Sequence, residues 1–269
     1  MSNQNSFREL TIILCLILLS SVISGCSTPR ELNYVALGDS IPDGWGIGGY
    51  GEEHVNYVEC FAEHLRKDFD IDIAVQNFCD SSGIRTVHLI EKLQKDDELR
   101  QAVADADIIT VWIGVNELGT PPNLYMAGMC GGEDNLEFVR ERVHEFNNNI
   151  DNILDEILAL NSSEETQIMI ADNVIPAAFA VNWKKQGSFE VLQAELYEAL
   201  NDHLYQAARE RNITVVPVYR AINGPSGDKG NEGLYQDDGI HFNVEGHRLI
   251  ADIHREAWEW AQTLNQPGT

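Results

Sequence analysis

Two short polar segments, one near each end of the chain, carry the residue types of a nucleophilic site. Gly38-Asp39-Ser40 follows an apolar run, and Asp238-Gly239-Ile240-His241 lies near the C-terminus. A serine hydroxyl becomes a good nucleophile when a histidine accepts its proton, and a carboxylate then fixes the tautomer of that histidine. Ser40, His241 and Asp238 supply these three groups. Each segment alone is typical of an ordinary turn or helix cap, so the inference rests on their joint presence.

Two residues between these segments offer hydrogen-bond donors for the oxyanion of an acyl-transfer reaction. Asn116 closely follows the most apolar internal run of the chain, and Gly83 follows another apolar stretch. A side-chain amide can donate to a developing oxyanion, and a glycine lets a backbone N–H approach a substrate closely. Ser40, Gly83, Asn116 and His241, each in its own block and in this order, resemble the four signature residues of the SGNH hydrolase superfamily, also called GDSL esterases and lipases. The resemblance extends from about residue 32 to residue 261.

The resemblance implies a serine esterase that needs no metal and no organic cofactor. In the family pattern Ser40 is the nucleophile, His241 is the general base and Asp238 orients His241. The backbone N–H groups of Ser40 and Gly83 and the side chain of Asn116 form the oxyanion hole. The chain departs from that pattern in two places. Glu117 replaces the usual Asp after Asn116 and keeps the negative charge. Ile41 replaces the usual Leu after the nucleophile and keeps an apolar side chain.

Other residues compete for the same roles. Asp237 is a close rival of Asp238, which we prefer because the family places the acid three residues before the histidine. Asp39 adjoins Ser40, but adjacent side chains at a strand-to-helix turn point apart, so we expect Asp39 to hydrogen-bond the backbone and stiffen the turn. Among the other histidines, His54 could line the substrate cleft, although a surface loop is its simpler interpretation.

The N-terminal segment predicts export and lipid attachment in a bacterial cell envelope. Residues 10–23 are a largely apolar stretch, which is short for a membrane span of about 20 residues, and Ile23-Ser24-Gly25-Cys26 fits a lipobox. We expect residues 1–25 to be a lipoprotein signal peptide and Cys26 to carry lipid. Residues 26–31 would then tether the domain to the membrane on the extracytoplasmic side. An ordinary signal peptide or a short membrane anchor is the alternative.

The charge balance restricts the possible partners. With 43 acidic and 18 basic residues the formal net charge is -25. Such a surface repels phosphates, which argues against nucleic acid and against a basic patch that grips anionic lipid. Membrane attachment would therefore depend on the lipid at Cys26.

The remaining cysteines permit at most one internal disulfide. Outside the N-terminal segment the chain has Cys60, Cys79 and Cys130. Cys79 and Cys130 follow the two strands that lead to the oxyanion residues, so a bridge between them could staple the rim of the site. The alternative is that all three are free thiols. Their spacing gives no zinc pattern, and we assign no metal.

Apolar runs rich in valine and isoleucine alternate with longer helical patterns, which predicts a parallel sheet with crossover helices. We expect a single α/β domain over residues 32–264, with residues 265–269 as a tail. It should be a three-layer sandwich around a five-stranded parallel sheet, the flavodoxin-like fold that the resemblance implies. The predicted strands lie near residues 34–37, 71–77, 107–113, 167–171 and 214–218, and the clearest helices near residues 55–68, 135–160, 190–211 and 243–264.

Ligands of such sheets bind beyond the carboxyl ends of the strands. Ser40, Gly83 and Asn116 each follow a predicted strand at that end. The irregular stretch 118–134, rich in proline and glycine, could be a specificity loop or a neutral insertion. Trp45, in the loop after Ser40, could stack on a sugar, clamp an acyl chain or simply pack.

The sequence thus favours a lipid-anchored serine hydrolase of carboxylic esters, acting on small-molecule or polysaccharide esters. A carbohydrate O-acetyl esterase of the same family is the main alternative. An anchored binding module without turnover is the second. The third is a phosphoryl-transfer site that uses Asp39 with Asp237 or Asp238 and a divalent cation.

Overall fold

The computed structural model of the protein describes residues 31–47 and 56–265. Its five strands form one parallel sheet in the order β2-β1-β3-β4-β5. The bounds are β1 Leu32–Gly38, β2 Ile73–Asn77, β3 Ile108–Trp112, β4 Gln167–Ala171 and β5 Thr214–Val216. The predicted α/β fold with a five-stranded parallel sheet is therefore confirmed. The expected signal peptide, Cys26 and His54 lie outside the described residues.

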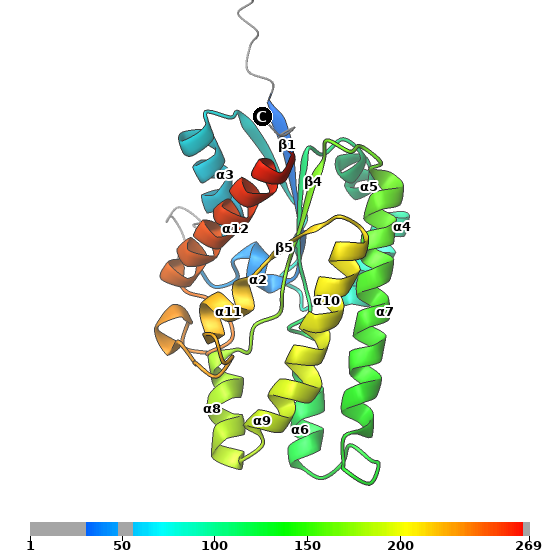
Figure 1. Cartoon of the computed structure of the whole chain (residues 1–269), viewed down its shortest axis with the longest axis vertical. Helices are drawn as coiled ribbons and strands as arrows, with labels where there is room; N and C mark the ends of the chain where they lie inside the picture. The colour runs from blue at the N-terminus through cyan, green and yellow to red at the C-terminus, as the bar shows by residue number, and fades with distance from the viewer. Residues whose placement is uncertain (1–30, 48–55, 266–269) are drawn as a thin grey trace, which may run out of the picture. The chain divides into compact units, whose positions relative to one another are not determined.

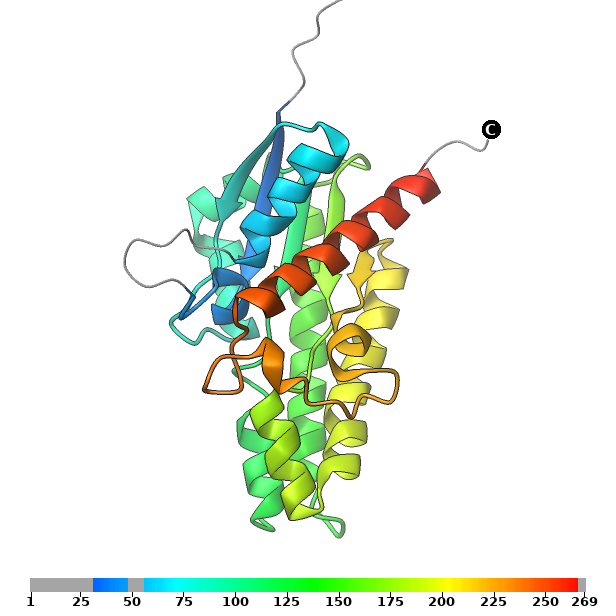
Figure 2. The ribbon, with the colours of Figure 1, turned by 90° about the vertical axis from the view of Figure 1, so that its left-hand side faces the viewer.

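Helices cover both faces of the sheet, and the described residues from Leu32 onward form one compact unit (Figure 1). One face carries four helices: α4 (Thr86–Lys95), α5 (Asp97–Ala104), α7 (Glu137–Leu160) and α10 (Ala199–Glu210). The other face carries α3 (Tyr57–Phe69) and α12 (Val244–Asn265), which cross the sheet side by side (Figure 2).

The strands are apolar on both faces because both faces are covered. In β1, Val35 and Leu37 belong to the apolar cluster under α4 and α7, whereas Tyr34 and Ala36 belong to the cluster under α3 and α12. All four side chains are fully buried. Because side chains on both faces are buried, the sequence shows continuous apolar runs rather than an alternation of apolar and polar residues.

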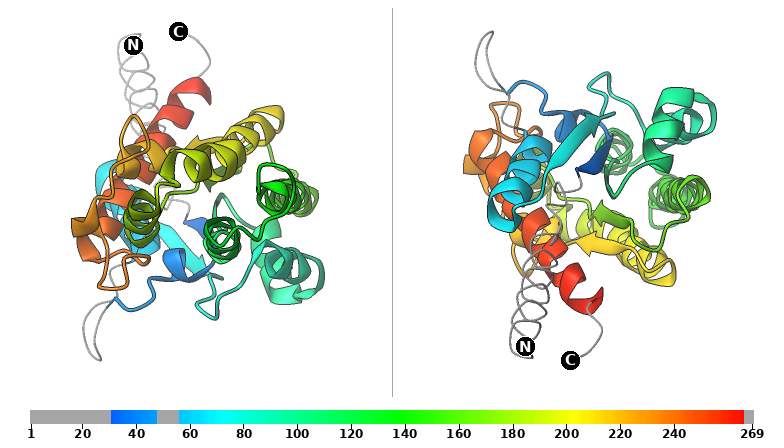
Figure 3. Two further views of the ribbon diagram at one scale, coloured as in Figure 1. Left: turned by 90° about the horizontal axis from the view of Figure 1, so that it is seen from below. Right: turned by 90° about the horizontal axis from the view of Figure 1, so that it is seen from above.

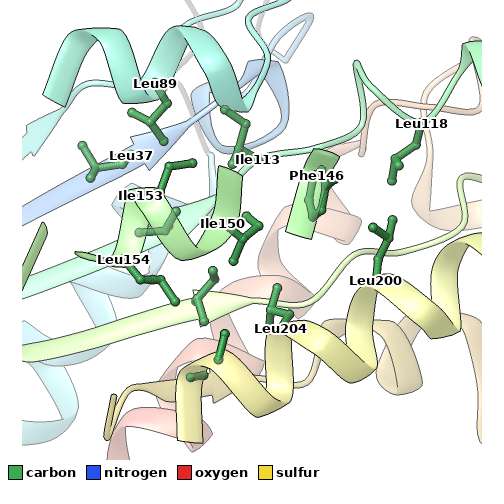
Figure 4. Packing of buried hydrophobic residues seen from close by; sticks show 14 of the residues in the cluster. Leu37, Leu89, Ile113, Leu118, Phe146, Ile150, Ile153, Leu154, Leu200 and Leu204 are labelled. Atoms are coloured by element: carbon green, nitrogen blue, oxygen red, sulfur yellow. The ribbon is translucent and has the colours of Figure 1, made fainter. Parts of the chain in front are cut away.

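The longest helix, α7, carries its buried apolar residues on one face. Its residues Phe146, Ile150, Ile153 and Leu154 point toward the sheet and meet Leu200 and Leu204 of α10 (Figure 4). Each such buried side chain stabilises the fold by about 1.5–3 kcal/mol relative to exposure.

The structure also contains shorter helices that the sequence analysis did not specify. The expected irregular stretch 118–134 includes a helix, α6 (Thr120–Met126), in which both prolines occupy the first turn, where a missing N–H costs no hydrogen bond. Three segments together fill the helix predicted at 190–211: α9 (Phe189–Leu192), the π-helical η1 (Gln193–Glu198) and α10. The remaining short elements are α2 (Ser40–Asp43), α8 (Ala177–Gln186), α11 (Val218–Asn223) and the 3₁₀ turn η2 (Glu232–Leu234).

Among the residues that the structure describes, no helix combines the length and the apolar character that a membrane span requires.

Candidate active site

Ser40 is placed by the turn that links the end of β1 to α2. Asp39 caps α2: its Oδ1 accepts the N–H of Ile41 at 3.0 Å, and its Oδ2 accepts the N–H of Gly114 at 3.1 Å. Burial raises the pKa of Asp39 to about 7 in spite of these hydrogen bonds. Asp39 thus joins the turn after β1 to the loop after β3, and its predicted role in stiffening the turn is confirmed.

Ser40, His241 and Asp238 lie in a continuous hydrogen-bonded row. Ser40 Oγ is 2.9 Å from His241 Nε2, and His241 Nδ1 is 2.6 Å from Asp238 Oδ2. With Nδ1–H donating to the carboxylate, Nε2 of the neutral imidazole faces the serine hydroxyl as an acceptor. The adjacent Asp237 forms no hydrogen bond or ion pair within the described part of the chain. The geometry therefore selects Asp238 over Asp237 as the partner of His241.

Backbone donors keep Asp238 ionised beside the imidazole. The N–H groups of Ile240 and His241 donate to Asp238 Oδ1 at 2.8 and 2.9 Å. Partial burial by itself would raise the pKa of Asp238. The hydrogen bonds from the His241 side chain and from these two N–H groups outweigh burial and lower the pKa.

The loop that carries His241 is a tight turn held at both ends. Tyr235 and Phe242 form an antiparallel bridge, and the N–H of Gln236 donates to the carbonyl of His241 at 2.8 Å. Gly239 has a φ of +65°, and a Cβ there would lie 2.9 Å from the Cβ of Ala178 at the start of α8. Only glycine fits this turn, because it tolerates both the left-handed backbone and the close approach of α8.

A second contact fastens the His241 loop to the loop that follows Ser40. Gln236 Nε2 donates to the carbonyls of Trp45 at 2.7 Å and Phe242 at 2.9 Å. The Trp45 ring lies against the His241 ring, with centroids 4.4 Å apart, while 47% of Trp45 stays exposed. Sequence reasoning offered Trp45 only as a stacking or packing residue and overlooked Gln236. No local signal marks either one, because their contacts join segments about two hundred residues apart.

The two expected oxyanion donors come from adjacent loops. Gly83 has a φ of +80°, a left-handed conformation that favours glycine, and its missing Cβ would lie 4.0 Å from Asn116 Oδ1. Asn116 Nδ2 donates to the carbonyl of Ile84 at 2.8 Å. An amide nitrogen carries two hydrogens, so one remains available for a ligand.

Glu117 adds a second link between these loops. Its Oε1 accepts both the N–H and the hydroxyl of Thr86, the first residue of α4, at 2.5 Å each, and Asn149 Nδ2 donates to the Thr86 hydroxyl at 2.9 Å. Burial raises the pKa of Glu117. Glu117 is thus more than a charge-conserving departure from the family pattern, because it anchors the Asn116 loop to α4.

A cleft of about 600 Å³ opens beside Gly83 and follows one side of α4. Both of its lysines are paired: Lys92 Nζ lies 2.6 Å from Asp80, and Lys95 Nζ lies 2.8 Å from Glu91. The lining residues are Ser82, Gly83, Ile84, His88, Glu91, Lys92, Lys95 and Asp96.

The predicted disulfide between Cys79 and Cys130 is wrong, because both residues, like Cys60, are free thiols. The sheet separates the pair. Cys130 is buried in the cluster under α4 and α7, whereas Cys79 packs against the cluster on the opposite face. Burial raises the pKa of both thiols.

Among the described residues, the carboxylates near the nucleophile do not gather into a cation site. Both oxygens of Asp39 are engaged by backbone N–H groups, which leaves this side chain unsuited to bind a cation together with Asp238. In residues 31–47 and 56–265, no three His, Cys, Asp or Glu side chains lie close enough together to hold a metal ion.

Several solved structures share the fold of the chain. The lipase Lip_vut3 from a goat rumen metagenome superimposes with a TM-score of 0.67 at 20% identity, over 84% of this chain and 97% of that one. A variant of the acetyl xylan esterase Axe2 from Geobacillus stearothermophilus superimposes with a TM-score of 0.56 at 18% identity, over 90% of this chain and 99% of that one. The esterase EstA from Pseudoalteromonas sp. superimposes with a TM-score of 0.54 at 16% identity, over 88% of this chain and 100% of that one. These likenesses show a shared fold.

No curated protein matches the chain. A family model does: residues 36–249, which include Ser40, Gly83, Asn116 and His241, match the model described as the GDSL-like Lipase/Acylhydrolase family. Since the match spans most of the chain, this protein belongs to the GDSL-like lipase/acylhydrolase family.

Proposed function

We propose that the protein hydrolyses carboxylic esters through an acyl-enzyme on Ser40. The observation that carries the proposal is the row of contacts from Ser40 Oγ to His241 Nε2 at 2.9 Å and from His241 Nδ1 to Asp238 Oδ2 at 2.6 Å. A serine, an imidazole and an ionised carboxylate in this order form the arrangement that activates a hydroxyl nucleophile. Membership of a lipase and acylhydrolase family supports the same reaction class.

The reaction proceeds in two displacements. Ser40 Oγ attacks the ester carbonyl carbon while His241 Nε2 takes the hydroxyl proton, and Asp238 stabilises the resulting imidazolium. The N–H groups of Ser40 and Gly83 and the Asn116 amide hold the tetrahedral oxyanion. His241 then gives its proton to the departing alcohol, which leaves an acyl group on Ser40. A water molecule that loses its proton to His241 attacks this acyl group and releases the carboxylic acid.

A carbohydrate O-acetyl ester is the second candidate substrate. The cleft beside Gly83 carries paired lysines and carboxylates, whose donors and acceptors can hydrogen-bond the hydroxyl groups of a sugar. One structural relative is named an acetyl xylan esterase and another a lipase. A series of p-nitrophenyl esters from acetate to decanoate separates the two, because activity confined to acetate favours the carbohydrate ester.

We further propose that the protein is exported and anchored by lipid at Cys26 in a bacterial cell envelope. The lipobox Ile23-Ser24-Gly25-Cys26 after an apolar stretch supports this assignment. Metabolic labelling with palmitate should mark the wild-type protein and not Cys26→Ala. Labelling of Cys26→Ala would contradict the assignment.

The direct test of the reaction is hydrolysis of p-nitrophenyl acetate and butyrate by residues 27–269, with and without chelator, beside Ser40→Ala. We expect activity that survives the chelator and disappears in Ser40→Ala. A fluorophosphonate probe should label the parent protein at Ser40. A folded protein that neither hydrolyses these esters nor reacts with the probe would favour the binding module, and loss of activity on chelation would favour phosphoryl transfer.

A further inference from the structure

A second hollow, of about 450 Å³, lies at the free edge of the sheet. β5 is the last strand in the sheet order, and α10 and α12 flank it on opposite sides (Figure 3). The hollow reaches Gln167 and Thr214, the first residues of β4 and β5. Ser40 instead follows the carboxyl end of β1, so the two sites lie at opposite ends of the strands.

Two exposed aromatic rings face this hollow from different layers. Trp260 of α12 is 59% exposed and Tyr205 of α10 is 41% exposed. The Tyr205 hydroxyl donates to Asp172 Oδ2 at 3.1 Å, which holds its ring in place. Large aromatic side chains left in water at a concave surface mark a binding site more often than isolated exposed residues do.

Three of the polar side chains that line the hollow are uncommitted. Arg209, Glu164 and Asn212 form no side-chain hydrogen bond or ion pair within the part of the chain that the structure describes. Together they present the donors of a guanidinium and an amide and the acceptors of a carboxylate and an amide. The one positive and one negative charge balance, although the whole chain has a net charge of -25.

We propose that this hollow binds a pyranose unit of a neutral polysaccharide. A sugar ring has an apolar face of C–H groups that packs on an aromatic ring, and hydroxyls at its edge that need both donors and acceptors. Trp260 and Tyr205 supply the stacking surfaces, and the three uncommitted side chains supply the hydrogen bonds. The volume matches that of ordinary small-molecule sites.

An extended peptide is the alternative ligand for the free edge of β5, since peptides add to exposed strand edges. β5 has three residues, however, and a strand this short offers few backbone groups for pairing. Backbone pairing with a peptide would use neither the Trp260 and Tyr205 rings nor the uncommitted charged groups. The observations therefore favour the sugar.

The test measures binding of xylohexaose, cellohexaose and chitohexaose to the Ser40→Ala protein by calorimetry, with hexagalacturonate as an anionic control and a Thr-Val repeat peptide as the strand ligand. Ser40→Ala prevents turnover and leaves the hollow unchanged. At least one neutral oligosaccharide should bind, and adding Trp260→Ala should weaken that binding by about tenfold or more. Val181→Ala, which removes another exposed apolar side chain, should leave it unchanged.

Esterase assays separate this proposal from the proposed function. Trp260→Ala in the otherwise wild-type protein should hydrolyse p-nitrophenyl acetate at the parental rate, because Trp260 is remote from Ser40. The sugar proposal is overturned if no neutral oligosaccharide binds at millimolar concentration, if Trp260→Ala and Tyr205→Ala both bind it as the parent does, or if only the peptide or hexagalacturonate binds. Each of these outcomes leaves the assignment of Ser40 intact.

Discussion

At the scale of single residues, the proposed chemistry depends on the tautomer of one imidazole. Asp238 accepts the Nδ1–H of His241 and is held ionised by the N–H groups of Ile240 and His241. An amide in its place could donate to Nδ1 and so leave the proton on Nε2, where it would block the acceptance of the Ser40 proton.

We therefore expect Asp238→Asn to lower kcat by about 10⁴-fold with little change in stability, as a reversed tautomer does in serine hydrolases. Asp237→Asn is the matched control and should retain nearly full activity, because Asp237 forms no hydrogen bond with the imidazole. Steady-state kinetics on p-nitrophenyl acetate measures both. Equal losses in the two variants would contradict the assignment of Asp238.

At the scale of elements, the site depends on contacts that tie loops from distant parts of the chain to one another. The side chain of Gln236 joins the His241 loop to the carbonyl of Trp45, and Trp45 covers the imidazole. A displacement of about 1 Å between a nucleophile and its base can lower a rate by about a hundredfold.

Gln236→Leu removes this link and should lower kcat by about 10- to 100-fold, because His241 is no longer held in position beside Ser40. KM should change little, because the surface that binds the substrate stays intact. The rate of fluorophosphonate labelling at Ser40 should fall in parallel. Gln101→Leu, at an exposed glutamine on α5, serves as the control. Unchanged labelling in Gln236→Leu would show that the loops hold their relative position without this side chain.

Glu117 acts on the oxyanion side in a similar way. Glu117→Ala leaves the N–H and hydroxyl of Thr86 without their acceptor, so we expect the free energy of unfolding to fall by about 1–3 kcal/mol and kcat to fall as well. Glu117→Gln keeps one carbonyl acceptor and should recover most of both losses. Chemical denaturation and steady-state kinetics provide the readouts. An alanine variant with the parental kcat would restrict Glu117 to a structural role.

At the scale of the whole molecule, two buried histidines make stability depend on pH. His247 and His254 of α12 stack on Tyr57 of α3; His247 Nδ1 accepts the N–H of Tyr57, and His254 Nδ1 donates to the carbonyl of Ile250. Burial lowers the pKa of His247 to about 3 and that of His254 to about 4.

In the unfolded chain these side chains bind protons below a pH of about 6.5, whereas the folded protein keeps them neutral. Their contribution to stability is therefore complete above that pH and is lost as the pH falls toward 4 and then 3. We expect His254→Gln, which removes one titrating group and keeps an N–H donor, to shrink the difference in Tm between pH 7 and pH 4.5. A difference as large as in the wild type would assign the acid sensitivity to other groups.

Burial acts in the opposite direction on two carboxyl groups. It raises the pKa of Asp39 and Asp172 to about 7, so these groups favour the folded state at low pH and oppose it as the pH rises toward 7. The Tm of His254→Gln must therefore be compared with the Tm of the wild type at each pH, because the two carboxyl groups also change the stability of both proteins with pH.

The sequence by itself determined the class of fold and the positions of the five strands to within a few residues, and it predicted the residues of the candidate site. These features depend on local information: apolar runs mark strands that are buried on both faces, helical spacing marks α7, and the blocks around Ser40 and His241 each fit within a few residues. The expected disulfide was wrong because Cys79 and Cys130 follow neighbouring strands along the chain yet lie on opposite faces of the sheet.

Only the tertiary structure decided which side chains meet across the molecule. It selected Asp238 over Asp237 by the 2.6 Å contact with His241, placed Trp45 on the imidazole, and gave Gln236 a position between two loops. It also brought Trp260 and Tyr205, from helices on opposite sides of β5, to the lining of one hollow. Such contacts depend on where distant backbone segments cross, and hydrophobic periodicity sets the face of each element without fixing the positions of individual side chains on different elements.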